Sequence, residues 1–390
     1  MRKIIVFLNS YLHGIAGGDV WVIEVMKRIL KQNNNNEIYI VTSELGKKFC
    51  QDMHLKGENV HFLITTDESD IRKTLCNIIF VYLKRIVRGL IISSSLRRIT
   101  DINTIIFASS IFLPDIIPIF AFEKGKKFTI FHMAAPNPLR GYRSYPSFLD
   151  RIRSLLFWIN EKIALTLIKM SQISVFALPT TVDLLSKNGI DRNRIFITYN
   201  GVDFEYIGRF NCSEKKYHAC WIGRAHPQKG VEDLLKAWKL VVEQVDNAKL
   251  LLAGPETENY IPLVERLDLR SNVDVKGFVP QEEKFKLMKE SLLFVFPSYH
   301  ESFPIAILEA LACGLPIIAY DLTIYKKTYN DLLITVPVGN WKFLAKKIVE
   351  TLGNVEKIKK FNKKITSSKA ILKYSWDNIA NNFWEVITTL

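Results

Sequence analysis

Short apolar runs alternate with helical patterns along the first half of this 390-residue chain. The first run, residues 3–9, precedes a glycine-containing loop and a segment whose apolar residues at 22, 23, 26, 29 and 30 share one helix face. Further runs predict strands at residues 37–43, 60–66, 104–109, 127–132, 173–179 and 195–201. This alternation predicts a parallel sheet covered by helices.

The same pattern starts again after a polar stretch near residues 205–215. Strands are predicted at 217–224, 249–255, 273–279, 292–298, 316–321 and 332–338, with a helix at 231–245 and an amphipathic helix at the C-terminus. We therefore expect an α/β chain of two doubly wound, Rossmann-like domains. Two such sheets facing each other form a cleft at their carboxyl ends, where open parallel sheets bind ligands.

Composition excludes several classes of protein. With 48% apolar and 24% charged residues, the chain is globular rather than disordered. Its five widely spaced cysteines indicate neither a disulfide framework nor a zinc site, and buried thiols in a reducing compartment explain them. The apolar N-terminus is too short for a signal peptide. Residues 105–122 contain Asp115 and two prolines, which favours a strand, a loop and a buried helix over a membrane span.

The net charge of +14 is concentrated in residues 71–100, which hold seven basic residues and no acid. Basic and apolar residues alternate there, as in a helix pair on an anionic membrane surface. Three or four such residues facing lipid would contribute roughly 3–4 kcal/mol. A solvated face on ordinary core helices is the alternative, and nucleic acid is disfavoured because no recognition motif accompanies the charge. The seven are Arg72, Lys73, Lys84, Arg85, Arg88, Arg97 and Arg98.

Two carboxylates, Glu301 and Glu309, flank an otherwise uncharged run after the strand at 292–298. Pro304 suits a first helical turn, so we expect a helix to begin near residues 303–305, with its N-terminus available to phosphate. Glu309 then lies inside an apolar helix, where an unpaired carboxylate costs several kcal/mol. Ribose hydroxyls would serve as donors to Glu309. The alternative is that each of the two acids pairs with a nearby lysine or arginine.

Three other strand ends carry candidate ligand groups. The loop 223–230 holds Arg224 and Lys229, a fork and a point charge that suit a diphosphate. Gly254 permits close backbone approach, and the segment 277–280 offers backbone groups to a nucleobase. Taken singly, each also fits an ordinary loop or turn.

In combination these residues resemble the family-4 retaining glycosyltransferases of group 1, which have the GT-B fold. That family has Gly-Arg, then Lys-Gly five residues on from the Arg, then Glu-x7-Glu and Ala-Cys-Gly-x-Pro. This chain has Gly223-Arg224, Lys229-Gly230, Glu301, Glu309 and the segment ALACGLP at 310–316. NGVD at 200–203 also resembles the family's entry to the second domain. The resemblance is strong over about residues 195–325 and looser elsewhere.

The resemblance implies an acceptor-binding domain at residues 1–205, joined by a C-terminal helix at about 375–390, and a nucleotide-sugar-binding domain at 206–374. Arg224 and Lys229 would neutralise the departing diphosphate, Glu301 would contact the donor sugar, and Glu309 the ribose. Where many members have Glu-Gly-Phe-Gly, this chain has Pro304 in place of the last glycine, which removes one amide. The donor-binding residues implied are Gly17, Gly18, Gly254, Val279, Ser302, Phe303, Pro304, Ile305 and Glu309.

In the first domain, Gly17-Gly18 resembles the family's glycine loop, although a tight turn is the alternative. His132 ends a predicted strand, at a place where some lipid-directed members of the family have a histidine near the reacting sugar. The resemblance implies that His132 orients the acceptor hydroxyl or the donor sugar as a fourth catalytic residue, and a hydrogen-bonded histidine of the cleft is the alternative. Residues 133–147 are predicted to form an acceptor loop, in which Arg140 and Arg143 would bind an anionic acceptor such as a lipid phosphate.

The resemblance thus implies a hexosyltransferase (EC 2.4) that uses a UDP-sugar or GDP-sugar as substrate, without metal or further cofactor. It would transfer the sugar with retention to a lipid-linked or cell-surface glycan, in the cytoplasm and peripheral to the inner face of the cell membrane. Three alternatives stay open: a soluble disaccharide or glucan synthase, a sugar-nucleotide epimerase, and a catalytically silent, membrane-docked partner of a glycosyltransferase complex.

Overall fold

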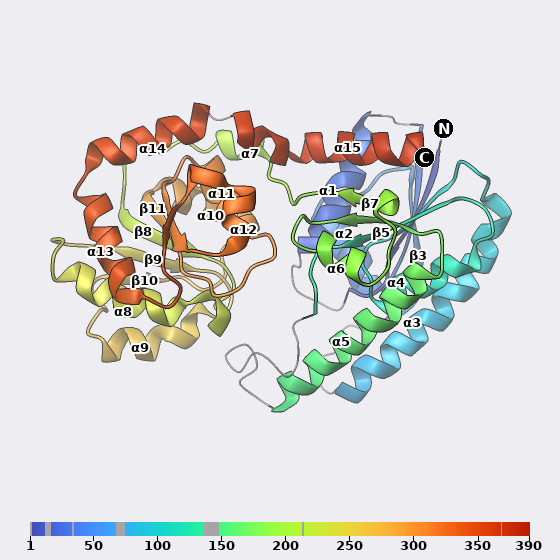
Figure 1. Cartoon of the computed structure of the whole chain (residues 1–390), viewed down its shortest axis with the longest axis horizontal. Helices are drawn as coiled ribbons and strands as arrows, with labels where there is room; N and C mark the ends of the chain where they lie inside the picture. Colours follow the sequence, from blue (N-terminus) through green and yellow to red (C-terminus); the bar gives the residue numbers. More distant parts are fainter. Residues whose placement is uncertain are drawn as a thin grey trace. The chain divides into compact units, whose positions relative to one another are not determined.

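The computed structural model describes residues 2–11, 17–32, 35–67, 75–135, 148–212, 214–367 and 369–390. The chain divides into two compact units. Unit 1 comprises Met1–Asn200 and Trp376–Leu390, and unit 2 comprises Gly201–Ser375. Figure 1 shows that each unit has its own sheet with helices around it. The predicted α/β class with two parallel sheets is therefore confirmed.

The sheet of unit 1 has seven parallel strands in the order β3-β2-β1-β4-β5-β6-β7 within the described residues. The central strands β1 and β4 are buried on both faces, which explains their unbroken apolar runs. The strands are β1 Lys3–Leu8, β2 Glu37–Thr42, β3 Val60–Ile64, β4 Ile105–Ala108, β5 Lys126–Phe131, β6 Ser174–Ala177 and β7 Ile195–Ile197.

Helices cover both faces of this sheet and form two apolar clusters with it. The α-helices are α1 Gly17–Gln32, α2 Glu44–Asp52, α3 Leu75–Leu96, α4 Leu113–Ile116, α5 Phe148–Lys169, α6 Val182–Lys187 and α15 Trp376–Thr389. Shorter 3-10 helices lie at Arg97–Ile99, Ile117–Ala121 and Arg192–Arg194.

The C-terminal helix α15 belongs to unit 1 although it follows all of unit 2 in sequence. It packs against α1, and its buried residues Trp376, Ile379 and Phe383 join the core on that face of the sheet. An ion pair reinforces the contact, because Arg28 Nε donates to Asp377 Oδ1 at 3.0 Å. The chain therefore closes unit 1 with its last fifteen residues.

The basic segment 71–100 differs from the predicted helix pair. Residues 71–74 lie outside the described part of the chain, and the remainder forms the single helix α3 followed by the 3-10 turn Arg97–Ile99. Arg85 is fully buried, and its guanidinium donates to the carbonyl oxygens of Asn9 at 2.9 Å and Tyr11 at 2.6 Å. Arg85 is therefore not one of the basic residues that could face lipid, because its charge satisfies backbone groups inside unit 1.

Residues 105–122 form strand β4, helix α4 and the 3-10 turn Ile117–Ala121, as the sequence predicts. No helix within the described ranges combines the length and apolar character needed to cross a membrane.

The sheet of unit 2 has six parallel strands in the order β10-β9-β8-β11-β12-β13 among the described residues. The strands are β8 Tyr217–Ile222, β9 Leu250–Ala253, β10 Val273–Val275, β11 Ser291–Phe296, β12 Ile317–Tyr320 and β13 Ile334–Val336. The predicted strand positions of both sheets are thus confirmed, with ends shifted by a few residues.

The α-helices of unit 2 are α7 Phe204–Gly208, α8 Val231–Val242, α9 Ile261–Arg266, α10 Gln281–Lys289, α11 Ile305–Ala312, α12 Thr323–Thr328, α13 Trp341–Leu352 and α14 Val355–Ser367. Helix α8 ends three residues before the predicted position 245. Shorter 3-10 helices lie at Pro227–Lys229, Thr257–Tyr260, Asn330–Leu332 and Lys369–Tyr374.

Each sheet has a topological switch point, where neighbouring strands lead to connections on opposite sides. It lies between β1 and β4 in unit 1, and between β8 and β11 in unit 2. In open α/β sheets, ligands bind at the carboxyl ends of the strands beside this point. The loops that follow these strands are therefore where a ligand site is expected.

Candidate active site

The loop after β8 holds Arg224 and Lys229 in a fixed conformation. Lys229 ends the 3-10 turn Pro227–Lys229, and Gly230 follows it in the left-handed region at φ 71°. A Cβ atom at Gly230 would lie 2.0 Å from the carbonyl oxygen of Pro297, so no other residue fits there without a shift. The backbone N–H of Tyr299 donates to the carbonyl of Gln228 at 2.8 Å. This bond joins the loop after β8 to the loop after β11.

Lys229 and Glu301 form an ion pair at the switch point. Lys229 Nζ lies 2.6 Å from Glu301 Oε1, with side-chain exposures of 20% and 7%. Among the described residues, Glu301 Oε2 has no hydrogen-bond partner, and it is not enclosed. The structure thus brings together two predicted catalytic residues from different loops, while Arg224 lies exposed in the same loop as Lys229.

Glu309 also forms a mostly covered ion pair in unit 2, and its partner is a residue that the sequence did not single out. Lys284 Nζ lies 2.6 Å from Glu309 Oε1, with side-chain exposures of 20% and 14%. Glu301 and Glu309 therefore each pair with a lysine, which was one of the two alternatives that the sequence left open. From the sequence, a partner for Glu309 could be expected only because a carboxylate inside an apolar helix needs a nearby cation.

Helix α11 begins at Ile305, and Pro304 stands before it as the N-cap residue. The predicted helix start near residues 303–305 is therefore confirmed, although Pro304 stands one residue before the first turn because its ψ of 110° is extended rather than helical. The side chain of Phe303 is buried against the rings of Tyr329 and Tyr374. The first turn of α11 therefore follows directly on the segment that carries Glu301, and Phe303 anchors that segment.

Asp233 also holds the loop after β11 in place. Its Oδ2 accepts hydrogen bonds from the hydroxyls of Tyr299 and Tyr320, the latter at 2.5 Å. Burial, with the Asp233 carboxylate adding to it, raises the pKa of Tyr320 far above its usual range. Asp233 belongs to α8 and Tyr320 ends β12, so this cluster ties three elements together beside Glu301. No pattern in the sequence indicates this cluster.

The loops after β9 and β10 approach each other closely. The N–H of Gly254 donates to the carbonyl of Gly277 at 2.5 Å. Gly254 has φ 124°, and a Cβ there would lie 2.1 Å from the carbonyl oxygen of Gly223. Val279 follows in the same segment, and Pro280 caps α10. The four strand ends predicted to bind the donor thus form one continuous edge of the unit 2 sheet.

In unit 1, His132 follows β5 and lies beside the first turn of α1. A Cβ at Gly18 would lie 3.4 Å from His132 Cδ2, and the Trp21 ring meets the imidazole edge-on. Both ring nitrogens are buried and have no hydrogen-bond partner among the described residues. Burial lowers the pKa of His132 to about 3, so the imidazole is neutral at pH 7. The alternative that His132 is a hydrogen-bonded histidine is therefore not supported by any partner among the described residues.

A buried carboxylate orders the chain after β1. Asp115 accepts hydrogen bonds from the N–H groups of Asn9 at 2.6 Å and Ser10 at 2.8 Å, and from the Ser10 hydroxyl at 2.6 Å. Burial raises the pKa of Asp115 to about 6, against these hydrogen bonds, which lower it. Burial also raises the pKa of Asp19, in the first turn of α1, to about 7, and the Asp115 charge adds to this. Sequence reasoning missed both roles.

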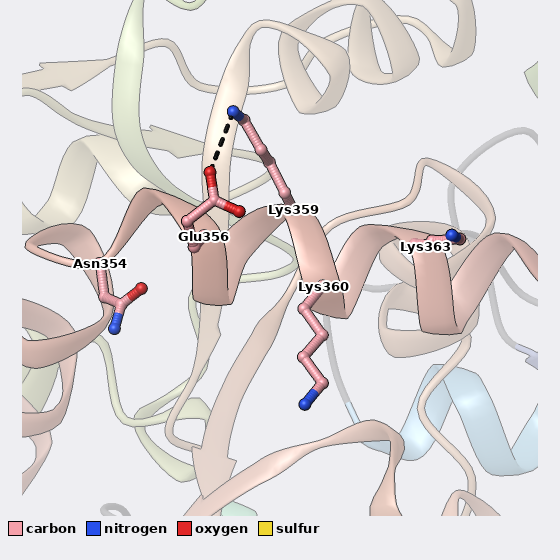
Figure 2. A pocket seen from close by; sticks show the side chains of 5 residues that line it. All are labelled: Asn354, Glu356, Lys359, Lys360 and Lys363. Atoms are coloured by element: carbon pink, nitrogen blue, oxygen red, sulfur yellow. Dashed lines mark hydrogen bonds and ion pairs between the residues drawn. The ribbon is translucent and has the colours of Figure 1, made fainter.

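Arg140 and Arg143, predicted to bind the acceptor, lie outside the described residues. So does most of the glycine loop before α1, although Gly17 and Gly18 are the first residues of that helix. Figure 2 shows a surface hollow elsewhere, on α14, lined by Asn354, Glu356, Lys359, Lys360 and Lys363. It contains none of the strand-end residues, so it is separate from the candidate site.

Comparison with known proteins places unit 2 in a family. Residues 203–367 match the model of the family described as glycosyl transferases group 1. A capsular polysaccharide biosynthesis glycosyltransferase of Staphylococcus aureus is 27% identical over 252 residues, which are 59% of this chain and 65% of that protein. An O-antigen chain mannosyltransferase of Escherichia coli is 29% identical over 139 residues, 35% of this chain and 36% of that protein. The matches thus span less than two thirds of these relatives' own length.

Solved structures match over the whole chain at low identity. HepE of Anabaena in complex with UDP-glucose has a TM-score of 0.73 at 16% identity, covering 100% of both chains. Sucrose-phosphate synthase of Thermosynechococcus elongatus has a TM-score of 0.76 at 14% identity, covering 100% of this chain and 99% of that one. These likenesses show the GT-B fold. Residues 203–367 therefore match the glycosyl transferases of group 1, within a chain that has the GT-B fold.

Proposed function

We propose that this chain is a family-4-type retaining glycosyltransferase that moves a hexose from a nucleotide diphosphate sugar to a glycan acceptor. The observation that carries the proposal is the Lys229–Glu301 pair at 2.6 Å, which lies at the switch point of unit 2 and next to the start of α11. A cation, a carboxylate with one unpaired oxygen and a helix N-terminus are the groups that a sugar diphosphate needs.

In the proposed mechanism, Lys229 and Arg224 stabilise the negative charge that develops on the diphosphate as the glycosidic bond breaks. The amides of the first turn of α11 add to this stabilisation. Glu301 accepts hydrogen bonds from the hydroxyls of the donor sugar. Glu309 accepts hydrogen bonds from the ribose, and the loops at Gly254 and Val279 contact the base. Retention of configuration then follows from attack of the acceptor on the face from which the diphosphate departs.

His132 is proposed to contribute from unit 1. A buried, neutral imidazole with two unpaired nitrogens can accept one hydrogen bond and donate another. We propose that it orients the acceptor hydroxyl or a hydroxyl of the donor sugar. Gly17 and Gly18, as the first residues of α1, would offer backbone amides to the diphosphate.

The proposed acceptor is a lipid-linked or cell-surface glycan. The relatives named for capsular polysaccharide and O-antigen synthesis support this class, and HepE supports a UDP-sugar as one candidate donor, with GDP-sugars as the other. Arg140 and Arg143 are proposed to bind an anionic group of the acceptor.

Two helices of unit 1 support action at a membrane surface. The ring of Phe112 lies 6.2 Å from that of Tyr82 on α3 and 5.2 Å from that of Phe157 on α5, so the two helices lie close together (Figure 1). Basic residues such as Arg88 and Arg151 are exposed on the same helices. Both helices leave large apolar side chains exposed: Ile79, Phe80, Leu83, Val87 and Ile91 on α3, and Leu155, Trp158, Ile159 and Ile163 on α5.

We propose that this α3–α5 face, defined by those nine residues, contacts an anionic bilayer. An exposed apolar surface with basic residues around it is typical of peripheral membrane proteins. The prediction from sequence thus changes in detail: α5 replaces the expected second basic helix, and Arg85 takes no part.

A transfer assay with membranes tests the proposed activity. Wild-type protein should move labelled sugar from one of a set of UDP- and GDP-sugars into the lipid or glycan fraction, and NMR of the product should show the anomeric configuration of the donor. Lys229→Met should lower the rate on the order of 100-fold. Lys236→Met is the matched control, because Lys236 forms an exposed pair with Glu232 at the same distance of 2.6 Å.

The alternatives give other outcomes. A wild-type protein that binds a nucleotide sugar but neither transfers nor converts it would be a silent partner. Conversion of the donor without an acceptor would indicate an epimerase. Transfer to a soluble sugar or glucan, with no binding to vesicles, would indicate the soluble synthase.

A further inference from the structure

We infer that Lys284 is a positioning residue of the ribose site: it holds one oxygen of Glu309 so that the other faces the nucleotide. The inference rests on the proposed function, and it concerns a residue that neither the sequence pattern nor the comparisons assign. Its basis is the ion pair of 2.6 Å between Lys284 Nζ and Glu309 Oε1.

The geometry of the pair leaves one carboxylate oxygen available. Lys284 contacts Oε1 alone, and Oε2 of Glu309 has no hydrogen-bond partner among the described residues. Oε2 is also absent from the enclosed polar atoms, so it is accessible. A ribose hydroxyl can therefore donate to Oε2 without displacing Lys284.

Burial makes the lysine necessary. Glu309 lies on α11 among residues that are apolar and buried, including Leu308 and Ala310. A carboxylate there without a cation would turn toward solvent or lose its fixed orientation, because an unpaired buried charge is strongly unfavourable. Lys284 compensates this charge and selects the rotamer of Glu309 that a ribose would meet.

The position of Lys284 also connects the ribose site with the base site. Helix α10 begins directly after Pro280, and the N–H of Lys284 donates to the Pro280 carbonyl at 2.9 Å. Lys284 therefore lies in the first turn after the segment proposed to contact the base. The base segment thus leads directly into the short helix that carries the lysine proposed to orient the ribose acid.

A second lysine on α10 gives a matched comparison. Lys286 pairs with Glu282 at 2.7 Å, but these side chains are 57% and 61% exposed. Exposed pairs of this kind contribute little to stability. The two lysines are two residues apart and have similar ion-pair distances, so burial and the neighbouring site are what distinguish Lys284.

The test measures dissociation constants by calorimetry for the full chain. Wild type is first titrated with UDP, GDP and ADP, and then with the 2′-deoxy and 3′-deoxy forms of the diphosphate that binds. The same titrations follow for Lys284→Met, Lys284→Arg, Lys286→Met and Glu309→Gln. Thermal unfolding checks that each variant is folded, and Lys284→Gln replaces Lys284→Met if the latter does not fold.

Wild type should bind the ribonucleotide at least about ten-fold more tightly than one of the deoxy forms, as expected for one hydrogen bond to a charged group. Lys284→Met should abolish most of this preference, and Lys284→Arg should retain it. Lys286→Met should leave the constants unchanged. In the Glu309→Gln background, Lys284→Met should have no further effect.

Two results would overturn the inference while leaving the proposed function intact. One is equal weakening of ribonucleotide and deoxynucleotide by Lys284→Met, which would mean that Lys284 acts elsewhere on the nucleotide or on the fold. The other is an unchanged preference in that variant. If wild type binds none of the three diphosphates, both the inference and the proposed function fail.

Discussion

At the residue scale, the site of unit 2 depends on glycines that no other residue can replace. Gly230 combines a left-handed backbone with a Cβ position 2.0 Å from the Pro297 carbonyl oxygen. Because this contact is with backbone, a side-chain rotation cannot relieve it. Gly230 therefore sets the distance between the loop that carries Lys229 and the loop that carries Glu301.

We predict that Gly230→Ala separates these loops and lowers donor binding by at least about ten-fold, with about 1–3 kcal/mol lost from the stability of unit 2. Chemical denaturation and nucleotide titration measure the two effects. Gly208→Ala is the control, because a Cβ at Gly208 would have no atom within 4 Å. Equal effects of the two substitutions would contradict the proposed role of Gly230.

His132 gives a prediction about pH. Its pKa of about 3 in the folded protein lies below the ordinary value of 6.5, so the unfolded chain binds one more proton between these values. By linkage, the stability that the neutral imidazole contributes is complete above pH 6.5 and declines as the pH falls, by at most about 1.4 kcal/mol per pH unit. Burial raises the pKa of Asp19 to about 7, so the contribution of Asp19 to stability changes with pH in the opposite direction.

The test therefore compares wild type with His132→Gln, since Asp19 and Asp115 contribute to both proteins. As the pH falls from 6.5 to 4.5, the unfolding free energy of wild type should decrease relative to that of His132→Gln. A difference that does not change with pH would mean that His132 is not held neutral by burial.

At the element scale, the last helix of the chain completes the core of the first unit. Phe383 on α15 is buried, and its ring centroid lies 5.3 Å from that of Trp21, 5.4 Å from that of Phe107 and 4.8 Å from that of Phe176. These aromatic residues come from α1 and from the strands β4 and β6. The C-terminal helix is thus a structural part of unit 1.

We predict that Phe383→Ala lowers the unfolding free energy of the protein by about 3–5 kcal/mol, through lost burial and the cavity left behind. Asn382→Ala, at an exposed neighbouring position, should change it by less than about 0.5 kcal/mol. Urea denaturation compares the two, and a similar small effect of both would show that α15 is not part of the core.

The α3–α5 face gives the second prediction at this scale. Leu83→Asp on α3 and Ile159→Asp on α5 should each reduce binding to vesicles containing anionic lipid by at least about ten-fold, because each removes apolar burial and adds a repelled charge. Ile102→Asp is the control, since Ile102 is equally apolar and exposed in unit 1 but lies on neither helix.

Flotation of the three variants with vesicles measures this binding. Retained flotation of Leu83→Asp and Ile159→Asp, or equal loss in Ile102→Asp, would contradict a membrane role for the face.

At the scale of the whole molecule, the sequence predicts the architecture well, because parallel strands buried on both faces appear as unbroken apolar runs. The strands β1 and β8 are found for this reason. The motif residues could also be found, since Arg224, Lys229, Glu301 and Glu309 follow such runs at fixed spacing. At these positions, a charged side chain directly after an apolar strand is enough to indicate a ligand-binding role.

What the sequence could not predict depends on packing between distant segments. Arg85 and Arg88 look alike in a basic helix, yet only Arg85 is buried, because the chain after β1 offers carbonyl groups to it. Lys284 and Lys286 are equally indistinguishable within α10, and only Lys284 meets Glu309. Asp233 gains its role from two tyrosines 66 and 87 residues away.

The central claim is that unit 2 binds a nucleotide sugar through Lys229, Glu301 and Glu309. The most direct test is the melting temperature of wild type, Lys229→Met, Glu309→Gln and Lys236→Met with UDP-, GDP- and ADP-sugars at millimolar concentration. A ligand present at 100 times its dissociation constant stabilises the folded protein by about 2.7 kcal/mol, which shifts the melting temperature by several degrees. We expect one donor class to raise it in wild type and Lys236→Met but not in the other two variants. No shift with any nucleotide sugar, or an equal shift in all four proteins, would contradict the claim.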